Sequence, residues 1–230
     1  MRLRFLFLLA FVFLTISQVN AAQSHPIIIR ETGLRTYLYI PDSYDSDVPV
    51  PLVIALHGMG EYAEGTFKIW LPIAKSLGFI LACPQGSVFQ SGYSRAPTDD
   101  RKEIVAIKSY LEARYSIDPH KILLAGFSRG GNFAIETGGI YPESFPKTLC
   151  IFGFFTQTAY SIFRPRKGSE YPYSHFYIFT GTGDLTESSA RSGSQYLQNM
   201  GIVTTLIVSP TLKHRYPPTL DTIVKDILKI

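Results

Sequence analysis

The sequence predicts an α/β fold, a mostly parallel sheet with helices on both faces. Short continuous apolar runs recur along the chain, as in PLVIALHG, GFILACP and KILLAGF, and such runs are typical of strands buried on both faces of a parallel sheet. Segments with helical periodicity separate them; in the clearest, Ile104, Ile107 and Leu111 recur at helical spacing. In sheets of this kind, ligands bind beyond the carboxyl ends of the strands.

The expected elements alternate regularly along the chain. The strands are an opening hairpin at 27–30 and 34–41, then 51–58, 78–84, 121–127, 147–155, 175–184 and 202–208. The helices are 62–77, which Pro72 is expected to interrupt, then 98–115, 129–142, 188–201 and 217–230. Asp99 and Asp100 open the second helix, where carboxylates are expected to cap the helix and complement its dipole rather than to catalyse.

Composition favours one globular domain over residues 22–230. Of the 230 residues, 46% are hydrophobic and 17% are charged, which argues against disorder. Two arginines precede the apolar run Phe5–Ile16, and Val19 and Ala21 supply a small-residue cleavage site. Residues 1–21 therefore predict a cleaved signal peptide and a secreted or periplasmic protein. An uncleaved anchor is the alternative, but the run is shorter than the roughly 18 residues of a membrane span.

The net charge and the spacing of Cys and His residues argue against nucleic-acid binding and against a metal site. The formal charge is +4, and loss of the two leader arginines leaves about +2, too little to indicate nucleic-acid binding. No pair of Cys or His residues has the spacing of a metal site. Cys83 and Cys150 lie in apolar segments of separate expected strands, so a disulfide and two buried free thiols both remain open.

The stretch LLAGFSRGGNFA carries the candidate nucleophile, Ser128. Gly126, Ser128 and Gly130 form a G-x-S-x-G pattern, with an apolar strand before it and a helix after it. A sharp strand-to-helix turn strains the serine backbone, and the glycines let neighbouring elements approach. The hydroxyl then projects near backbone N–H groups at the positive end of a helix. This context predicts catalysis rather than a plain turn.

A serine nucleophile needs a base, and the position of each histidine relative to the sheet selects one. His25 lies in the N-terminal tail, and His120 and His175 precede strands, at the wrong edge. His57 and His214 follow strands, at the carboxyl edge. We expect His214, in the loop TLKHRYPP, to be the base, and His57 to order its own loop.

Asp184 is the expected acid, because it directly follows the strand that ends in FTG and so reaches the same edge. Glu187 is a weaker candidate, and Asp118 precedes a strand, at the wrong edge. The tetrahedral oxyanion needs two donors. We expect the backbone N–H groups of Arg129, directly after the nucleophile, and of Met59, within HGMG, to supply them.

The motifs HGMG, GFSRGG, GTGD and KHRYPP, in this order, resemble the α/β-hydrolase superfamily over residues 27–230. Residues 77–146 resemble the poly(3-hydroxybutyrate) depolymerase and feruloyl esterase-like group, and phospholipase/carboxylesterase-type enzymes look similar. The resemblance implies an eight-stranded sheet whose second strand is antiparallel, and hydrolysis of esters through an acyl-enzyme without a cofactor. Lys213 replaces the glycine that often precedes the catalytic histidine, and Arg129 replaces a common Asn or Ala. Both departures leave open whether the ester is a small molecule or a polymer.

Two other functions remain open from the sequence. One is a serine peptidase of the same fold, and the other is a catalytically silent relative that binds a partner or ligand. The segment between the strands near Phe155 and His175 is too short for a large lid domain. We therefore expect an open site flanked by Tyr160, Phe163 and Trp70.

Overall fold

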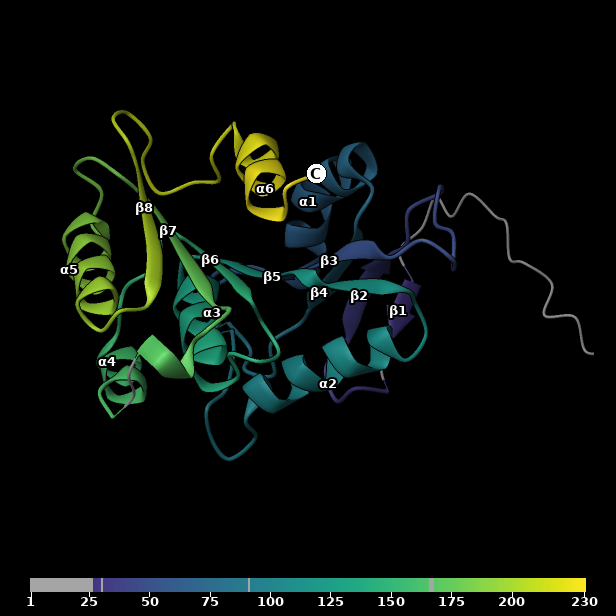
Figure 1. Ribbon diagram of the computed structural model, residues 1–230, viewed down its shortest axis with the longest axis horizontal. Helices are drawn as coiled ribbons and strands as arrows, with labels where there is room; N and C mark the ends of the chain where they lie inside the picture. The colour runs from purple at the N-terminus through teal and green to yellow at the C-terminus, as the bar shows by residue number, and fades with distance from the viewer. Residues whose placement is uncertain (1–26, 30, 91, 166–167) are drawn as a thin grey trace, which may run out of the picture.

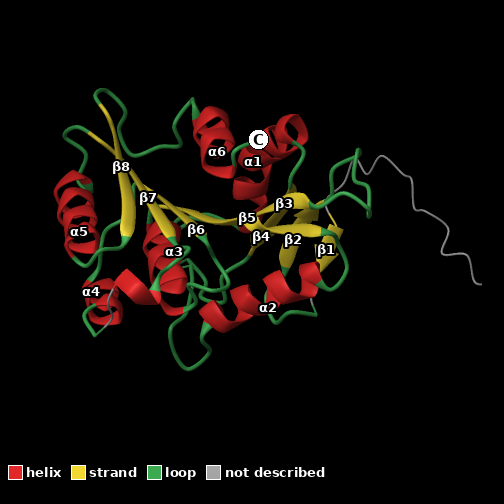
Figure 2. Cartoon of the chain, viewed as in Figure 1, coloured by secondary structure: helices red, strands yellow, loops and turns green. Residues whose placement is uncertain are grey.

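The computed structural model describes residues 27–29, 31–90, 92–165 and 168–230. The expected leader at 1–21 and His25 lie outside these residues. The described strands form one eight-stranded sheet in the order β1-β2-β4-β3-β5-β6-β7-β8 (Figures 1 and 2). The strands are β1 Ile27–Ile29, β2 Thr36–Tyr39, β3 Val50–Leu56, β4 Ile80–Pro84, β5 Ile117–Phe127, β6 Lys147–Ile151, β7 His175–Gly181 and β8 Val203–Ser209.

Strand β2 is antiparallel to both of its neighbours, β1 and β4, and every other pairing in the sheet is parallel. This arrangement confirms the mostly parallel sheet and the opening hairpin expected from the sequence. The carboxyl ends of β3 to β8 therefore share one edge, and β5 lies between β3 and β6 near the middle of the sheet. A residue that follows β5 can be reached by residues that follow its neighbours.

Helices cover both faces of the sheet. They are α1 Ala63–Leu77, α2 Asp100–Glu112, α3 Arg129–Ile140, α4 Gln157–Phe163, α5 Glu187–Asn199 and α6 Leu220–Leu228, with a short 3-10 turn at Gly168–Glu170. Figure 1 shows α1 and α6 above the sheet and α2, α3 and α4 below it. The buried clusters agree: α1 and α6 contribute to one core, whereas α2 to α5 contribute to cores on the other face.

The prediction that Pro72 interrupts the first helix was wrong, because α1 continues through it. Proline lacks the N–H that would bond to the carbonyl of Lys68 and normally breaks a helix there. Pro72 and Lys68 both lie on the exposed side of α1, where water can bond to the freed carbonyl. The other face of α1 is held to the core by Phe67 and Trp70.

The two cysteines are free and buried, which settles the alternative that the sequence left open. Cys83 lies on β4 and Cys150 on β6, and both β3 and β5 separate these strands in the sheet. Burial raises the pKa of Cys150 to about 12 and raises the pKa of Cys83 well above its ordinary value. Both are therefore packing residues rather than reactive thiols.

Within the described residues, no helix has the length and apolar character needed to cross a membrane. The same part of the chain holds no group of His, Cys, Asp and Glu side chains placed to bind a metal ion.

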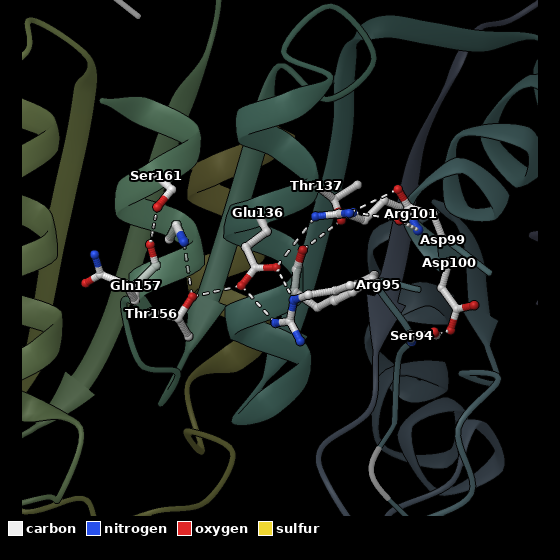
Figure 3. Close-up of polar contacts among 12 residues, drawn as sticks. Ser94, Arg95, Asp99, Asp100, Arg101, Glu136, Thr137, Thr156, Gln157 and Ser161 are labelled. Atoms are coloured by element: carbon white, nitrogen blue, oxygen red, sulfur yellow. Dashed lines mark hydrogen bonds and ion pairs between the residues drawn. The ribbon is translucent and has the colours of Figure 1, made fainter. Parts of the chain in front are cut away.

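A buried carboxylate on α3 joins three segments on the lower face of the sheet (Figure 3). Glu136 is fully buried and accepts hydrogen bonds from Arg95 Nε at 2.7 Å and Arg95 Nη2 at 2.8 Å. The hydroxyl of Thr156, the N-cap of α4, donates to the same carboxylate at 2.8 Å. Glu136 thus ties the loop after β4 and the start of α4 to the helix that follows Ser128.

The aspartates at the start of α2 have different roles. Asp99 is the N-cap and accepts from the backbone N–H of Arg101, as expected. Asp100 is fully buried, and its Oδ2 accepts from the backbone N–H groups of Ser87 and Ser94 at 2.9 Å. Asp100 therefore holds the β4–α2 loop, which supports a structural role for this carboxylate rather than a catalytic one.

We expect Arg95→Ala to lower the free energy of unfolding by about 3 kcal/mol, because it leaves the Glu136 carboxylate buried without its bidentate partner. Urea unfolding at neutral pH measures the change. Lys68→Ala is the control, since Lys68 and Glu64 form a fully exposed ion pair, and such pairs contribute little to stability. Equal effects of the two substitutions would contradict this role of Glu136.

Candidate active site

Ser128 lies at the turn between β5 and α3, at the carboxyl edge of the sheet. Its φ of 52° and ψ of −119° lie in a region that side-chain-bearing residues rarely adopt. Its backbone N–H donates to the carbonyl of Ile151 at 2.8 Å, so the end of β6 holds the strained turn in place. Strain of this kind costs of order 1–3 kcal/mol and persists where surrounding structure enforces it.

The glycines around Ser128 are required by close backbone contacts. A Cβ on Gly126 would overlap the carbonyl of Gly130. A Cβ on Gly130 would lie 2.5 Å from the carbonyl oxygen of His57 and 2.6 Å from that of Leu56. The start of α3 therefore packs directly on the end of β3, which confirms the steric role expected of these glycines.

His214 lies in the loop after β8 and contacts Ser128. Its Nε2 lies 2.9 Å from Ser128 Oγ, a hydrogen-bond distance. The imidazole lies near the rings of Phe127 and Phe152, with centroid distances of 5.2 and 5.5 Å. Lys213 stands where the enzymes that the sequence resembles often have glycine, and its Nζ donates to the carbonyl of Thr182 at 2.9 Å. This bond joins the His214 loop to the loop that carries Asp184.

Asp184 approaches the other side of the imidazole. The distance from Asp184 Oδ1 to His214 Nδ1 is 3.5 Å, an ion-pair contact that is longer than an ordinary N–H···O hydrogen bond. His214 Nδ1 is buried and makes no hydrogen bond to a described residue. Contacts between catalytic groups are often long in the absence of substrate and shorten in the substrate complex.

Thr186 holds the Asp184 carboxylate and was not predicted from the sequence. Its backbone N–H and its hydroxyl both bond to Asp184 Oδ1, at 2.9 and 2.7 Å, and Thr180 Oγ1 lies 3.0 Å from that hydroxyl. Burial acts to raise the pKa of Asp184, but the bonds from Thr186 and the proximity of His214 outweigh it, so the pKa is lowered. The available signal was the Asp-x-Thr spacing, which is typical of a side-chain turn.

His57 orders its loop, as expected. Its Nδ1 lies 2.9 Å from the carbonyl of Gly58, so Nδ1 carries the proton, and Nε2 accepts from the backbone N–H of Gly86 at 3.1 Å. Burial lowers the pKa of this imidazole, which favours the neutral form that these bonds require. With both ring nitrogens engaged, His57 does not act as a second base.

Met59 lies in the loop after β3, and Arg129 directly follows Ser128. Arg129 is the first residue of α3, where the helix dipole favours negative charge. In the loop after β3, the Gly58 N–H donates to Glu61 Oε2 at 2.8 Å, and the Gly60 N–H donates to Gln90 at 2.9 Å. These bonds engage the amides on both sides of Met59. The sequence did not predict this hydrogen bond from the loop to the Glu61 side chain.

Several other candidates have structural roles. Glu187, the weaker acid candidate, accepts from the Gly183 N–H at 2.6 Å and pairs with Arg191 at 2.9 Å, so it stabilises the start of α5.

The prediction that Phe163 and Trp70 flank the site was wrong, because both are fully buried in the core. Their helices turn these rings inward toward the sheet. Tyr160 packs its ring against Phe155 and Tyr196 instead.

Comparison with curated proteins finds similarity over part of the chain. No family model matches the sequence. The chain is 31% identical over 124 residues to feruloyl esterase B of Thermothelomyces thermophilus, covering 50% of this chain and 42% of that protein. It is 30% identical over 104 residues to the bifunctional acetylxylan esterase/xylanase XynS20E of Neocallimastix patriciarum, covering 44% of this chain and 15% of that protein. The chain thus spans less than half the length of the curated relatives it matches.

Solved structures extend the likeness to most of the described chain. S-formylglutathione hydrolase FrmB of Staphylococcus aureus superposes with a TM-score of 0.68 at 14% identity, covering 89% of this chain and 94% of that one. Acetyl xylan esterase of Aspergillus awamori gives a TM-score of 0.67 at 14% identity, covering 88% and 98%. At this identity the likeness shows the fold, and the side chains of the site must carry the argument about chemistry.

We expect Gly130→Ala to destabilise the protein by about 2 kcal/mol, because the added methyl group pushes α3 away from the end of β3. Gly65→Ala is the matched control: a Cβ on Gly65, in the first turns of α1, meets nothing within 4 Å. It is expected to stabilise by about 0.5–1 kcal/mol. Thermal or urea unfolding measures both, and a neutral Gly130→Ala would show that the close approach is not required.

We expect acid to destabilise the fold in part through His57. Its pKa is lowered by burial, so the unfolded chain binds this proton more readily than the folded chain does. The free energy of unfolding then falls as the pH is lowered from about 7 to about 5. The variant His57→Gln should lose less stability over this range. Burial, together with Lys147 and Lys229, lowers the pKa of His175, which acts in the same direction in both proteins. Parallel losses in the two proteins would contradict the role of His57.

Proposed function

We propose that this chain, which has the α/β-hydrolase fold, is a serine esterase that hydrolyses carboxylic esters through an acyl-enzyme. One observation carries the proposal: His214 Nε2 lies 2.9 Å from Ser128 Oγ, while Asp184 lies on the other side of the same imidazole. Nucleophile, base and acid come from the ends of β5, β8 and β7, which share one edge of the sheet. The order Ser, Asp, His is that of α/β-hydrolases.

Each residue of this set has a separate task in the proposed reaction. Ser128 Oγ attacks the ester carbonyl carbon while His214 Nε2 takes the hydroxyl proton. Asp184 holds the imidazole in the tautomer that leaves Nε2 free to accept, and stabilises the positive charge that forms on the ring. His214 then gives the proton to the departing alcohol oxygen, and the acyl group remains on Ser128. Water, deprotonated by His214, attacks the acyl-enzyme and releases the acid.

The backbone amides of Met59 and Arg129 are proposed to stabilise the tetrahedral oxyanion. Donors fixed in advance and aimed at the developing charge stabilise it without reorganisation during the reaction. Glu61 and Gln90 support this role, because they engage the amides of Gly58 and Gly60 and so fix the loop that carries Met59. The side chain of Arg129 is not required in this role.

The names of the curated relatives support an ester rather than a peptide substrate. The matched proteins are called feruloyl esterase B and bifunctional acetylxylan esterase/xylanase. We propose an ester substrate, small or polymeric, and no cofactor. We also propose that residues 1–21 are removed on export and that residues 22–230 act as one secreted or periplasmic domain. N-terminal sequencing of protein collected outside the expressing cell tests the cleavage site.

We expect Ser128→Ala to lower kcat for a soluble activated ester by about six orders of magnitude, because no acyl-enzyme can form. Asp184→Asn is expected to cost about four orders, because it favours the wrong imidazole tautomer. Steady-state hydrolysis of p-nitrophenyl esters measures both. Ser192→Ala, an exposed serine of α5, is the matched control and should behave as wild type. Full activity of Ser128→Ala, or faster cleavage of matched amides than of esters by wild type, would contradict the proposal.

A further inference from the structure

Exposed apolar side chains gather in the loops that surround Ser128. Ten large apolar or aromatic side chains of the described residues are exposed, and six of them follow strands at the carboxyl edge of the sheet. We call these six residues the apolar rim. They are Met59, Tyr62, Val88, Phe89, Phe154 and Leu185. Exposed apolar surface that collects in one place marks a binding site more often than scattered single residues do.

The rim lies on both sides of the nucleophile. Strands β3 and β4, which precede Met59 and Phe89, lie on one side of β5, and β6 and β7, which precede Phe154 and Leu185, lie on the other. The bond from Gly60 to Gln90 joins the first two loops.

Direct contacts also hold the second side of the rim beside the site. The backbone N–H of Phe154 donates at 2.6 Å to Asn132 Oδ1, in the first turn of α3 after Ser128. Leu185 directly follows Asp184 in sequence. Ser128 therefore lies between loops that carry exposed apolar side chains on either side of β5.

We propose that the apolar rim selects esters that carry apolar groups on both sides of the scissile bond. This inference rests on the proposed esterase function. Phe89 and Leu185 are 74% and 67% exposed, so each has a large apolar area that substrate can cover. Removing that area from water favours binding in proportion to the area covered. A sugar or glycerol on either side would leave its hydroxyl groups against side chains that offer no hydrogen bond.

The proposed mechanism assigns the alcohol and the acyl group of the ester to opposite sides of the rim. His214 must protonate the leaving oxygen, so the alcohol lies toward His214 and the neighbouring Asp184 loop. In this assignment Leu185, which directly follows Asp184 in sequence, lies on the alcohol side. The carbonyl oxygen points at the Met59 and Arg129 amides, and the acyl group continues toward the β3 and β4 loops, where Phe89 lies. The alcohol and acyl preferences should therefore be separable by substitution.

Four esters test the inference: hexyl hexanoate, hexyl acetate, glucose 6-hexanoate and glucose 6-acetate, each below its solubility limit. We expect wild-type kcat/KM to be highest for hexyl hexanoate and to fall about tenfold for each apolar group replaced. Leu185→Ser should lose the preference for the hexyl alcohol, and Phe89→Ser the preference for the hexanoyl group. Thermal unfolding of both variants, compared with wild type, shows that they fold.

Tyr173→Ser and Val203→Ser are the matched controls, because these residues are exposed at the opposite edge, before or at the start of β7 and β8. They should leave all four rates unchanged. Equal wild-type rates on the four esters, a preference for the glucose esters, or rim variants that match the controls would overturn the role of the rim while leaving the esterase function intact. No hydrolysis of any ester by wild type would overturn the esterase function and the inference together.

An apolar ester can belong to a lipid or to a polyester, and the same proteins distinguish these sources. Acid released from emulsified tributyrin and from short-chain polyester particles gives the two rates. A higher rate of wild type than of Phe89→Ser on one material identifies that source and supports the rim. Equal rates of wild type and the rim variants on both materials would overturn it.

Discussion

The close approach of α3 to the end of β3 is the constraint on which the site depends. It exists because Gly130 lets the helix backbone reach the carbonyls of Leu56 and His57. The approach forces the preceding turn to be sharp, and the sharp turn holds Ser128 at positive φ with its hydroxyl at the sheet edge. It also brings the loop after β3 beside the nucleophile. One steric condition thus positions both the serine and the loop of one proposed oxyanion donor.

The side chains of the proposed acid and base, Asp184 and His214, are held more loosely than Ser128, the proposed nucleophile. Asp184 and His214 lie on loops after β7 and β8, and their side chains approach to 3.5 Å rather than to hydrogen-bond distance. Thr186 orients the carboxylate, and Lys213 joins the two loops through the carbonyl of Thr182. Lys213 stands where the enzymes that the sequence resembles often have glycine, and its contact gives this residue a structural role. Bound substrate can shorten this contact between Asp184 and His214 to hydrogen-bond distance.

The sequence was sufficient for the features that follow from strand order and periodicity. Buried apolar runs predicted the parallel strands, and their carboxyl ends predicted which serine, aspartate and histidine would meet. The Glu136–Arg95 pair could not be predicted, because it joins segments 41 residues apart that only the folded chain brings together. Glu61 and Thr186 bond locally, to Gly58 and Asp184, and the Asp-x-Thr spacing was a signal for the second of these contacts. The predictions that Pro72 interrupts its helix and that Trp70 and Phe163 flank the site were wrong for a related reason. Whether a helix tolerates a proline, and whether a ring on that helix faces the site, depends on which side of the helix packs on the sheet.

The central claim is that His214 activates Ser128 as a covalent nucleophile. A fluorophosphonate reacts with a serine hydroxyl in the same way as the proposed ester substrate does, and leaves a stable adduct whose position peptide mass spectrometry identifies. We expect one adduct per chain, on Ser128, in the folded wild-type protein. We expect the reaction to be slowed by several orders of magnitude in His214→Ala and to be absent after denaturation. An adduct on another residue, or equal labelling of wild type and His214→Ala, would contradict the account.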